Sequence, residues 1–374
     1  MTDSTPERRS WGRLAQRALK PLLIIIVALG IGQSVRLAWN DLRANQSKAY
    51  NRIIALQQEL SDASPEKQAL IGAEISWIEE RQFSLNHIRW DIAGWAMVFA
   101  ISGILPPAFF WWLTLRSFGH PVPFLATLAA FASGNLGKYV PGKAMVLILR
   151  SGAMQRFGVP ISTSIVSIFI ETLTSLAVGG ALGALTLTAL HPPTWLFWAA
   201  IGVATVALIP TVPPIFRRLL VFFTQYRHLR LPKQLAHAMN WRLVASGWLL
   251  FLIGWLLMGT SLWIIGEAIR QSMNADSSPS TLLVSSFQLW WICVAATCIG
   301  FVVGFLSMLP GGAGVREVVL TMLLAPAIGY APALAAAVLY RIANLAAELL
   351  LAGITWQLAR KKTCNLPEES SKTG

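Results

Sequence analysis

Long apolar runs constrain this chain more than any other feature of its sequence. Six stretches are apolar over roughly the 20 residues that a helix needs to cross a bilayer core of about 30 Å. They are residues 21–39, 92–115, 161–190, 195–215, 243–269 and 331–358. The first has no small-residue cleavage site after it, and it is therefore expected to be a transmembrane helix or an uncleaved anchor.

Composition supports this interpretation. Only 13% of the residues are charged and 55% are hydrophobic, whereas a soluble globular protein has about 25% charged residues. The chain has too few charges to cover a water-facing surface, which excludes an ordinary soluble enzyme, a disordered protein and a DNA-binding domain. The formal net charge of +13 indicates basic loops that face anionic lipid, with no nucleic-acid partner.

Basic segments predict the orientation of the chain. The N-terminal residues 1–20, the acid-free segment 217–242 and the tail 359–374 are rich in Lys and Arg, and they belong in the cytoplasm. Residues 40–91 contain many acidic residues and belong on the other side. We therefore expect a protein of the cytoplasmic (inner) membrane with both termini in the cytoplasm.

The segment 40–91 predicts a helical hairpin outside the membrane. Its apolar residues follow helical periodicity in two pieces, and Ser64 and Pro65 mark the start of the second piece as N-cap and first helical residue. A solvated structural cap and a docking site for a protein partner are both open interpretations.

Two further apolar stretches contain Pro-Gly breaks and do not fit a simple span. Residues 121–154 contain Pro141-Gly142, and residues 285–329 contain Pro310-Gly311. The charge-derived orientation requires each stretch to end on the side where it began. Each is therefore predicted to be a re-entrant hairpin, a broken helix that dips into the membrane and returns.

The two hairpins recur at a nearly constant offset within similar surroundings. A span, a hairpin and a second span occupy residues 92–190 and again residues 243–358, with opposite orientation. The predicted fold class is therefore an all-α polytopic membrane protein with about six spanning helices and two re-entrant hairpins in an inverted repeat. Many secondary transporters have this architecture.

At these breaks the sequence resembles a known family. The strings NLGKYVPGK at 135–143 and LPGGAGVRE at 309–317 resemble the two signature regions of the lysylphosphatidylglycerol synthetase transmembrane region, a flippase-type domain, and Arg341 in LYRIANL matches as well. The resemblance covers roughly residues 90–358, so the membrane core is taken as residues 92–358. It implies movement of a polar lipid between leaflets. Members with lipid-aminoacylating activity carry a soluble domain after the membrane part, and because this sequence ends at Gly374 we expect no such activity.

The charged hairpin tips predict a headgroup site for an anionic lipid. Lys138, Lys143 and Arg316 are expected to hold the lipid phosphate, while glycines and helix N-termini bring backbone N–H groups near it. The predicted substrate-binding residues are Asn135, Gly137, Lys138, Tyr139, Gly142, Lys143, Gly311, Gly312, Arg316 and Arg341. Asn135 and Tyr139 have the alternative role of satisfying the freed backbone of the broken helix.

A second set of residues is expected to form structural ion pairs or breaks, or to couple transport to proton movement: Pro141, Glu171, Pro310, Glu317 and Glu348. Glu171 is predicted to pair with Arg341 from the other repeat. Glu348 lies seven residues after Arg341 on the same helix face and is predicted to form a further pair with it. Arg150 and Arg156 are interpreted as anchors at the cytoplasmic interface.

Motifs of catalysis are absent from the sequence, which has no HExxH, GxSxG, Walker or CxxC pattern. The five histidines lack ligand spacing, and Cys293 and Cys298 are expected to be buried, inert thiols, so we expect no cofactor and no metal. A transporter that is not an enzyme is the favoured function. The alternatives are an intramembrane enzyme with Glu171 as a base and an accessory protein that acts through residues 40–91.

Overall fold

The computed structural model describes residues 47–48, 50–61, 64–80, 89–139, 144–187, 194–227, 239–274 and 284–364. Within these residues the chain forms α-helices and short 3₁₀ turns and no strand. Six described helices are long and apolar enough to cross a membrane: Trp90–Ser117, Ile161–Thr186, Trp241–Gln271, Ser286–Leu306, Pro310–Ile328 and Pro332–Leu358. The predicted all-α polytopic class is confirmed. The predicted first span at 21–39 lies outside the described residues.

The first repeat begins with helix α3 (Trp90–Ser117) and continues with a helix, a break and a second helix. These are α4 (Phe124–Asn135), the 3₁₀ turn η2 (Leu136–Tyr139) and α5 (Ala144–Gln155), followed by the long helix α6 (Ile161–Leu187). Both α4 and α5 have 12 residues, about 18 Å of helix, which is too short to cross a bilayer core.

A short connecting unit follows. Helix α7 (Thr194–Leu208) leads through η4 (Ile209–Thr211) to α8 (Pro213–Arg227). The sequence predicts one span over 195–215, but α7 ends after 15 residues. Pro210 and Pro213 account for this early end, because proline lacks the N–H of a helix interior and Val212 between them is extended.

The second repeat has the same order of elements. Helix α10 (Trp241–Asn274) is followed by α11 (Ser286–Leu306), η6 (Pro310–Gly312), α12 (Val315–Ile328) and α13 (Tyr330–Cys364). Helix α11 has 21 residues, and by length and composition it can cross a membrane. The re-entrant course of this hairpin stays a prediction. If both of its arms cross instead, the chain still returns to the side from which it came.

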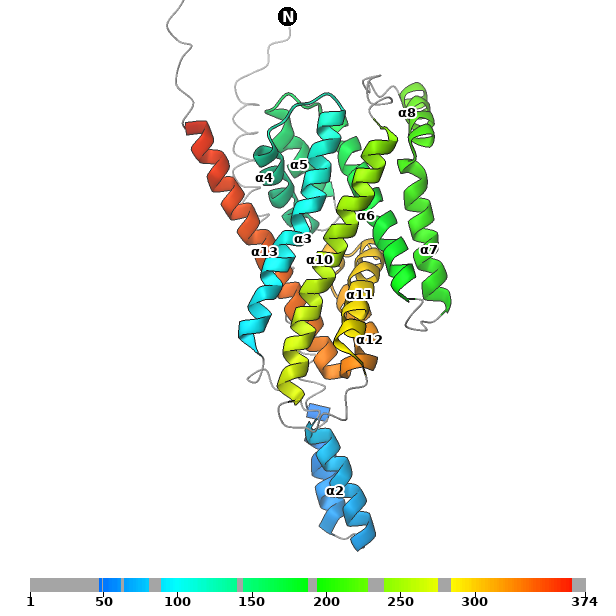
Figure 1. The fold of residues 1–374 in the computed structure, drawn as a ribbon, viewed down its shortest axis with the longest axis vertical. Coiled ribbons are helices and arrows are strands. Elements are labelled where there is room, and N and C mark those ends of the chain that lie inside the picture. Colours follow the sequence, from blue (N-terminus) through cyan, green and yellow to red (C-terminus); the bar gives the residue numbers. More distant parts are fainter. Residues whose placement is uncertain are drawn as a thin grey trace, which may run out of the picture.

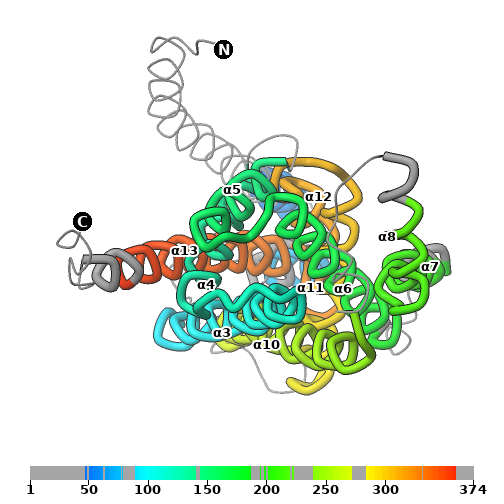
Figure 2. Tube along the Cα trace, turned by 90° about the horizontal axis from the view of Figure 1, so that it is seen from above, coloured from blue at the N-terminus to red at the C-terminus, as the bar shows by residue number. Residues whose placement is uncertain are grey.

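The two repeats interlock. Helices α3 and α10 pack along each other, and the two hairpins lie toward opposite ends of the bundle (Figure 1). Helix α4 of the first hairpin packs on α13, and α11 of the second packs on α6, so each hairpin contacts the last helix of the other repeat. Seen from above, α13 runs through the middle of the bundle between α4, α5 and α12 (Figure 2).

Small residues allow α3 and α10 to approach each other closely. A Cβ on Gly103 of α3 would lie 2.8 Å from Cγ of Met258 and 3.3 Å from the carbonyl oxygen of Gly254, both on α10. Small residues at such a seam let backbones approach, which is the usual basis of helix association in membranes. The packed pair of α3 and α10 forms the part of the bundle to which the two hairpins are connected.

A separate helical pair lies beyond one end of the bundle. Residues 50–61 are helical and pack on α2 (Pro65–Glu80), with Ile53 and Leu56 buried and an Arg52–Glu74 ion pair of 2.9 Å. Pro65 is the first helical residue, as the sequence predicts. This pair lies at the opposite end of the molecule from α8 and the last turns of α13 (Figure 1).

Candidate functional site

The two hairpin tips touch each other. Turn η2 contacts η6, and a Cβ on Gly311 would lie 2.9 Å from Cδ1 of Tyr139. Gly311 has φ +59° and Gly312 has φ +68°, conformations that favour glycine because it has no Cβ. Tyr139 is buried, with its ring against this glycine turn. The Pro-Gly break therefore brings the two repeats together at their tips.

An ion pair joins the first tip to the second repeat. The Lys138 ammonium of η2 pairs with the Glu348 carboxylate of α13, and the Tyr139 hydroxyl donates to the other oxygen of Glu348 at 3.3 Å. The sequence-based pairing of Glu348 with Arg341 is wrong. Helical spacing places these two residues on one face, but the lysine of the first tip reaches Glu348.

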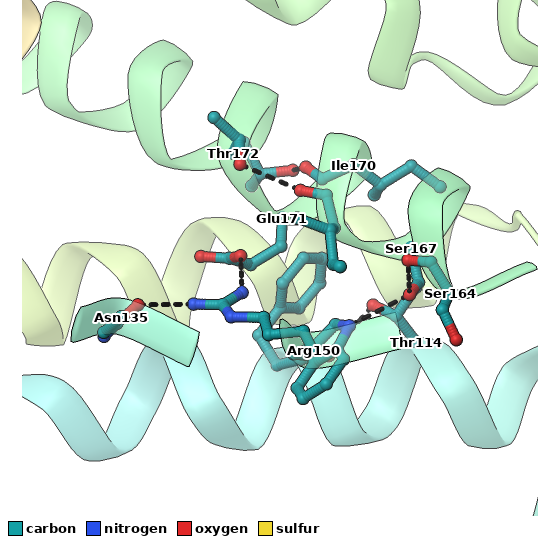
Figure 3. Close-up of polar contacts among 12 residues, drawn as sticks. Thr114, Asn135, Arg150, Ser164, Ser167, Ile170, Glu171 and Thr172 are labelled. Carbon is teal, nitrogen blue, oxygen red and sulfur yellow. Dashed lines mark hydrogen bonds and ion pairs between the residues drawn. The ribbon is translucent and has the colours of Figure 1, made fainter. Parts of the chain in front are cut away.

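Arg150 forms the most buried ion pair of the described residues. Its guanidinium donates to Glu171 at 2.6 Å and to the side-chain oxygen of Asn135 at 2.6 Å (Figure 3). The side chain of Arg150 is 3% exposed and that of Glu171 is 10% exposed. Two predictions are therefore wrong: Arg150 is not an interfacial anchor, and Glu171 does not pair with Arg341.

Two aromatic rings contact the guanidinium of Arg150, and a glycine leaves space for its side chain. Its guanidinium carbon lies 4.0 Å from the ring centroid of Phe131 and 5.2 Å from that of Trp111, both within cation–π range. A Cβ on Gly134 would lie only 2.3 Å from Cγ of Arg150. Sequence reasoning missed Gly134, Phe131 and Trp111. The sequence did offer one signal that Arg150 is buried: it lies six residues before Arg156, which places it about 9 Å of helix farther from the end of the hairpin.

The second repeat has an equivalent ion pair in which the acid and the cation have exchanged helices. Arg341 of α13 pairs with Glu317 of α12, and Glu317 also accepts a hydrogen bond of 2.7 Å from the backbone N–H of Gly314. In the first repeat the second hairpin arm supplies the cation and the last helix supplies the acid, whereas here the arm supplies the acid. Glu317 thereby caps the N-terminus of α12, which the sequence had assigned to a bound anion.

Arg316 differs from the other cations of the hairpins. It forms no ion pair within the described part of the chain, whereas Lys138, Arg150 and Arg341 each pair with an acid; its Nε, like that of Arg150, is buried without a hydrogen-bond partner. Its guanidinium carbon lies 5.8 Å from the centroid of the Phe301 ring, and its stem packs along Gly300 and Gly304 of α11. Arg316 follows η6 at the start of α12, so it lies beside the second tip.

The other predicted residues have simpler roles or lie outside the description. Gly137 lets η2 lie against the start of α5, because a Cβ there would be 2.9 Å from the backbone nitrogen of Val146. Pro310 opens η6. Pro141, Gly142 and Lys143 lie outside the described residues. Across the described ranges, no group of three or more His, Cys, Asp or Glu side chains is placed to hold a metal ion.

The fold and these buried charges define a class, namely a polytopic helical membrane protein whose two repeats each carry a broken-helix hairpin. The family profile of the lysylphosphatidylglycerol synthase TM region matches residues 69–352, and the chain belongs to this family. A search of curated proteins finds no match. The family resemblance drawn from the two tip motifs is thus confirmed. The protein is an integral membrane protein of a family linked to lipid metabolism or transport.

Proposed function

We propose that this protein moves a polar lipid between the two leaflets of the cytoplasmic membrane, along a path at the meeting point of the two hairpin tips. The observation that carries the proposal is the contact of η2 with η6 beside a cluster of buried charged residues. An ionised side chain within a membrane costs about 2.5–3.5 kcal/mol on insertion scales, so such groups usually mark a substrate path or a coupling site.

The family supports a lipid as the substrate. The family is named for the membrane region of lysylphosphatidylglycerol synthase, an enzyme that is itself named for a polar lipid. A protein that moves such a lipid has to let the polar headgroup cross the apolar core of the membrane. The buried charges at the tips give such a headgroup polar partners along that path.

Transport is favoured over intramembrane chemistry by the state of Glu171. As a general base it would need a free carboxylate oriented toward substrate, but Arg150 holds it at 2.6 Å inside a sheath of aromatic rings. We therefore propose that Glu171 is structural. The protein acts as a transporter and not as an enzyme.

The proposed orientation follows from charge. Helix α8 carries Arg217, Arg218 and Arg227, and it lies at the same end of the bundle as the last turns of α13 (Figure 1). We place that end in the cytoplasm, because cytoplasmic loops carry an excess of Lys and Arg. The helical pair of residues 50–80 then lies outside, where a protein partner can reach it.

A vesicle assay tests the function. Purified protein is reconstituted into liposomes that contain a fluorescent phosphatidylglycerol, and a membrane-impermeant quencher reports how fast the label leaves the inner leaflet. The native protein is expected to accelerate this movement well above protein-free vesicles. A Lys138→Met variant is expected to move lipid more slowly, whereas Arg156→Gln, an exposed change on the same hairpin, is expected to match the native rate. A native rate equal to that of empty vesicles contradicts the proposal.

A further inference from the structure

Helix α8 is separate from the spanning helices around it. Its 15 residues follow the break at η4, where Val212 is extended between Pro210 and Pro213, so α8 does not continue α7. It lies at the same end of the bundle as the first turns of α10 (Figure 1), and the view from above places it at the rim next to α7 (Figure 2). Helix α8 is therefore a peripheral helix at the level where the spanning helices end.

One face of α8 is fixed to the bundle by apolar packing. Phe216 is buried in a cluster that also contains Phe118, directly after α3, and Leu243 of α10. Ile215 and Leu219 are half-buried beside it. Since Phe216 attaches the first turns of α8 to the protein, the opposite face of the helix is directed away from the bundle.

That opposite face combines cations with large apolar side chains. Arg217 and Arg218 are exposed. Val221 and Phe222 are also exposed, at 49% and 51%. The two apolar residues each follow an arginine by four positions, which is the spacing of neighbours on a helix surface. Bulk water suits the arginines but not Phe222, and hydrocarbon suits Phe222 but not the arginines. The headgroup layer of a membrane suits both, because arginine reaches the phosphates while apolar side chains enter the acyl boundary.

The charge of this region favours an anionic surface. No Asp or Glu occurs in the sequence between Glu171 and Glu267, so α7 and α8 carry no acid that could neutralise the arginines. Each Lys or Arg near an anionic leaflet strengthens its association with that leaflet by about fivefold. A basic, acid-free helix at the end of the spanning helices is therefore complementary to anionic phospholipid.

We infer that α8 is an interfacial helix whose exposed face binds the anionic phospholipid surface of the membrane. Arg217 and Arg218 contact lipid phosphates, and Phe222 enters the boundary between headgroups and acyl chains. This surface is separate from the hairpin tips, and it requires no movement of lipid between leaflets. Because α7 and α8 connect the two repeats, the contact holds their connection at one leaflet.

The test measures which lipid lies next to Phe222 in the full-length chain. The three native cysteines are replaced, and Phe222→Cys is labelled with a fluorophore. The protein is reconstituted into phosphatidylcholine vesicles with an equal small fraction of nitroxide-labelled phosphatidylglycerol or nitroxide-labelled phosphatidylcholine. Both quenchers carry the nitroxide at the same shallow acyl position, so a difference in quenching reports the headgroup. Labelled phosphatidylglycerol is expected to associate about fivefold or more strongly than labelled phosphatidylcholine. Leu249→Cys, an exposed position within the α10 span, is the matched control and should show no headgroup preference.

Removal of the arginines tests their role. Arg217→Gln combined with Arg218→Gln is expected to abolish the preference at position 222, whereas Arg156→Gln, an exposed change on the first hairpin, should keep it. Equal quenching by both lipids with the native arginines present, or a preference that survives their removal, overturns the anionic surface. If Leu249→Cys is quenched and Phe222→Cys is not, the membrane contact itself is overturned, and an acidic protein or water covers this face. The comparison with both arginines present decides the inference even if the double variant fails to fold. The measurement needs no transport, so this inference and the proposed function fail independently.

Discussion

At the scale of single residues, burial distinguishes two kinds of arginine in the hairpins. Arg150 is buried among aromatic rings, paired with Glu171 and bonded to Asn135, whereas Arg316 is only partly buried and forms no ion pair in the described ranges. The first arrangement holds the first hairpin to the helix that follows it. The second places its guanidinium beside the ring of Phe301 on α11.

Breaking the Arg150 pair is expected to destabilise the protein. Glu171→Gln should lower the free energy of unfolding by about 3–5 kcal/mol, because removal of one partner leaves a buried charge uncompensated. Thermal melting in detergent measures this. The exposed ion pair Arg52–Glu74 supplies the control, since Glu74→Gln should change stability by less than about 1 kcal/mol. Equal melting of Glu171→Gln and the native protein would remove the structural role assigned to this pair.

Gly134 tests the same cluster from the packing side. Gly134→Ala places a Cβ at 2.3 Å from Cγ of Arg150, and the resulting overpacking should lower stability by about 1–3 kcal/mol. Gly152→Ala is the matched control in α5, where a Cβ meets nothing within 4 Å. That change should raise stability by up to about 1 kcal/mol, because alanine is the better helix former. The same direction for both variants would contradict the contact.

At the scale of elements, the pairing of helices carries information that sequence spacing does not. The ion pair of Lys138 with Glu348 links η2 to α13, and thus the first repeat to the second. A double-mutant cycle with Lys138→Met and Glu348→Gln is expected to give a coupling energy of about 0.5–3 kcal/mol.

The control cycle combines Glu171→Gln with Arg341→Gln, the pair that the sequence favoured. Its coupling energy should be near zero, because each of these residues has a different partner in the structure. A large coupling here with none between Lys138 and Glu348 would reverse the assignment of partners.

The sequence predicts which segments are helical better than it predicts their partners. Apolar runs and Pro-Gly breaks located α3, α6, α10, α13 and both hairpins, because helix formation and its interruption are local properties. Glu171 was assigned to Arg341 because the two residues have opposite charges and lie in the equivalent helices of the two repeats. Opposite charges alone are compatible with many other pairings. Only the packing of α5 on α6 and of α12 on α13 selects the observed partners. Gly134 carried no signal, since its role depends on a side chain 16 residues later.

At the scale of the whole molecule, the orientation in the membrane is directly testable. Single cysteines at Gly72 of α2 and at Arg156, both exposed, are introduced after replacement of the three native cysteines. An impermeant maleimide should label Gly72→Cys in intact cells and should label Arg156→Cys only after permeabilisation. Labelling of both from outside would contradict the proposed cytoplasmic placement of α8 and the last turns of α13.

The two hairpins share an order of elements but are held differently. Each is tied to the last helix of its own repeat by one buried ion pair, yet the first is also tied to α13 across the repeats through Lys138. Any displacement that separates η2 from α13 has to open this ion pair, whereas a displacement of α11 away from α6 opens no ion pair among the described residues. Ion pairs therefore anchor the first hairpin to both repeats and the second hairpin to its own repeat, so the internal symmetry of the fold does not extend to the bonds that hold it.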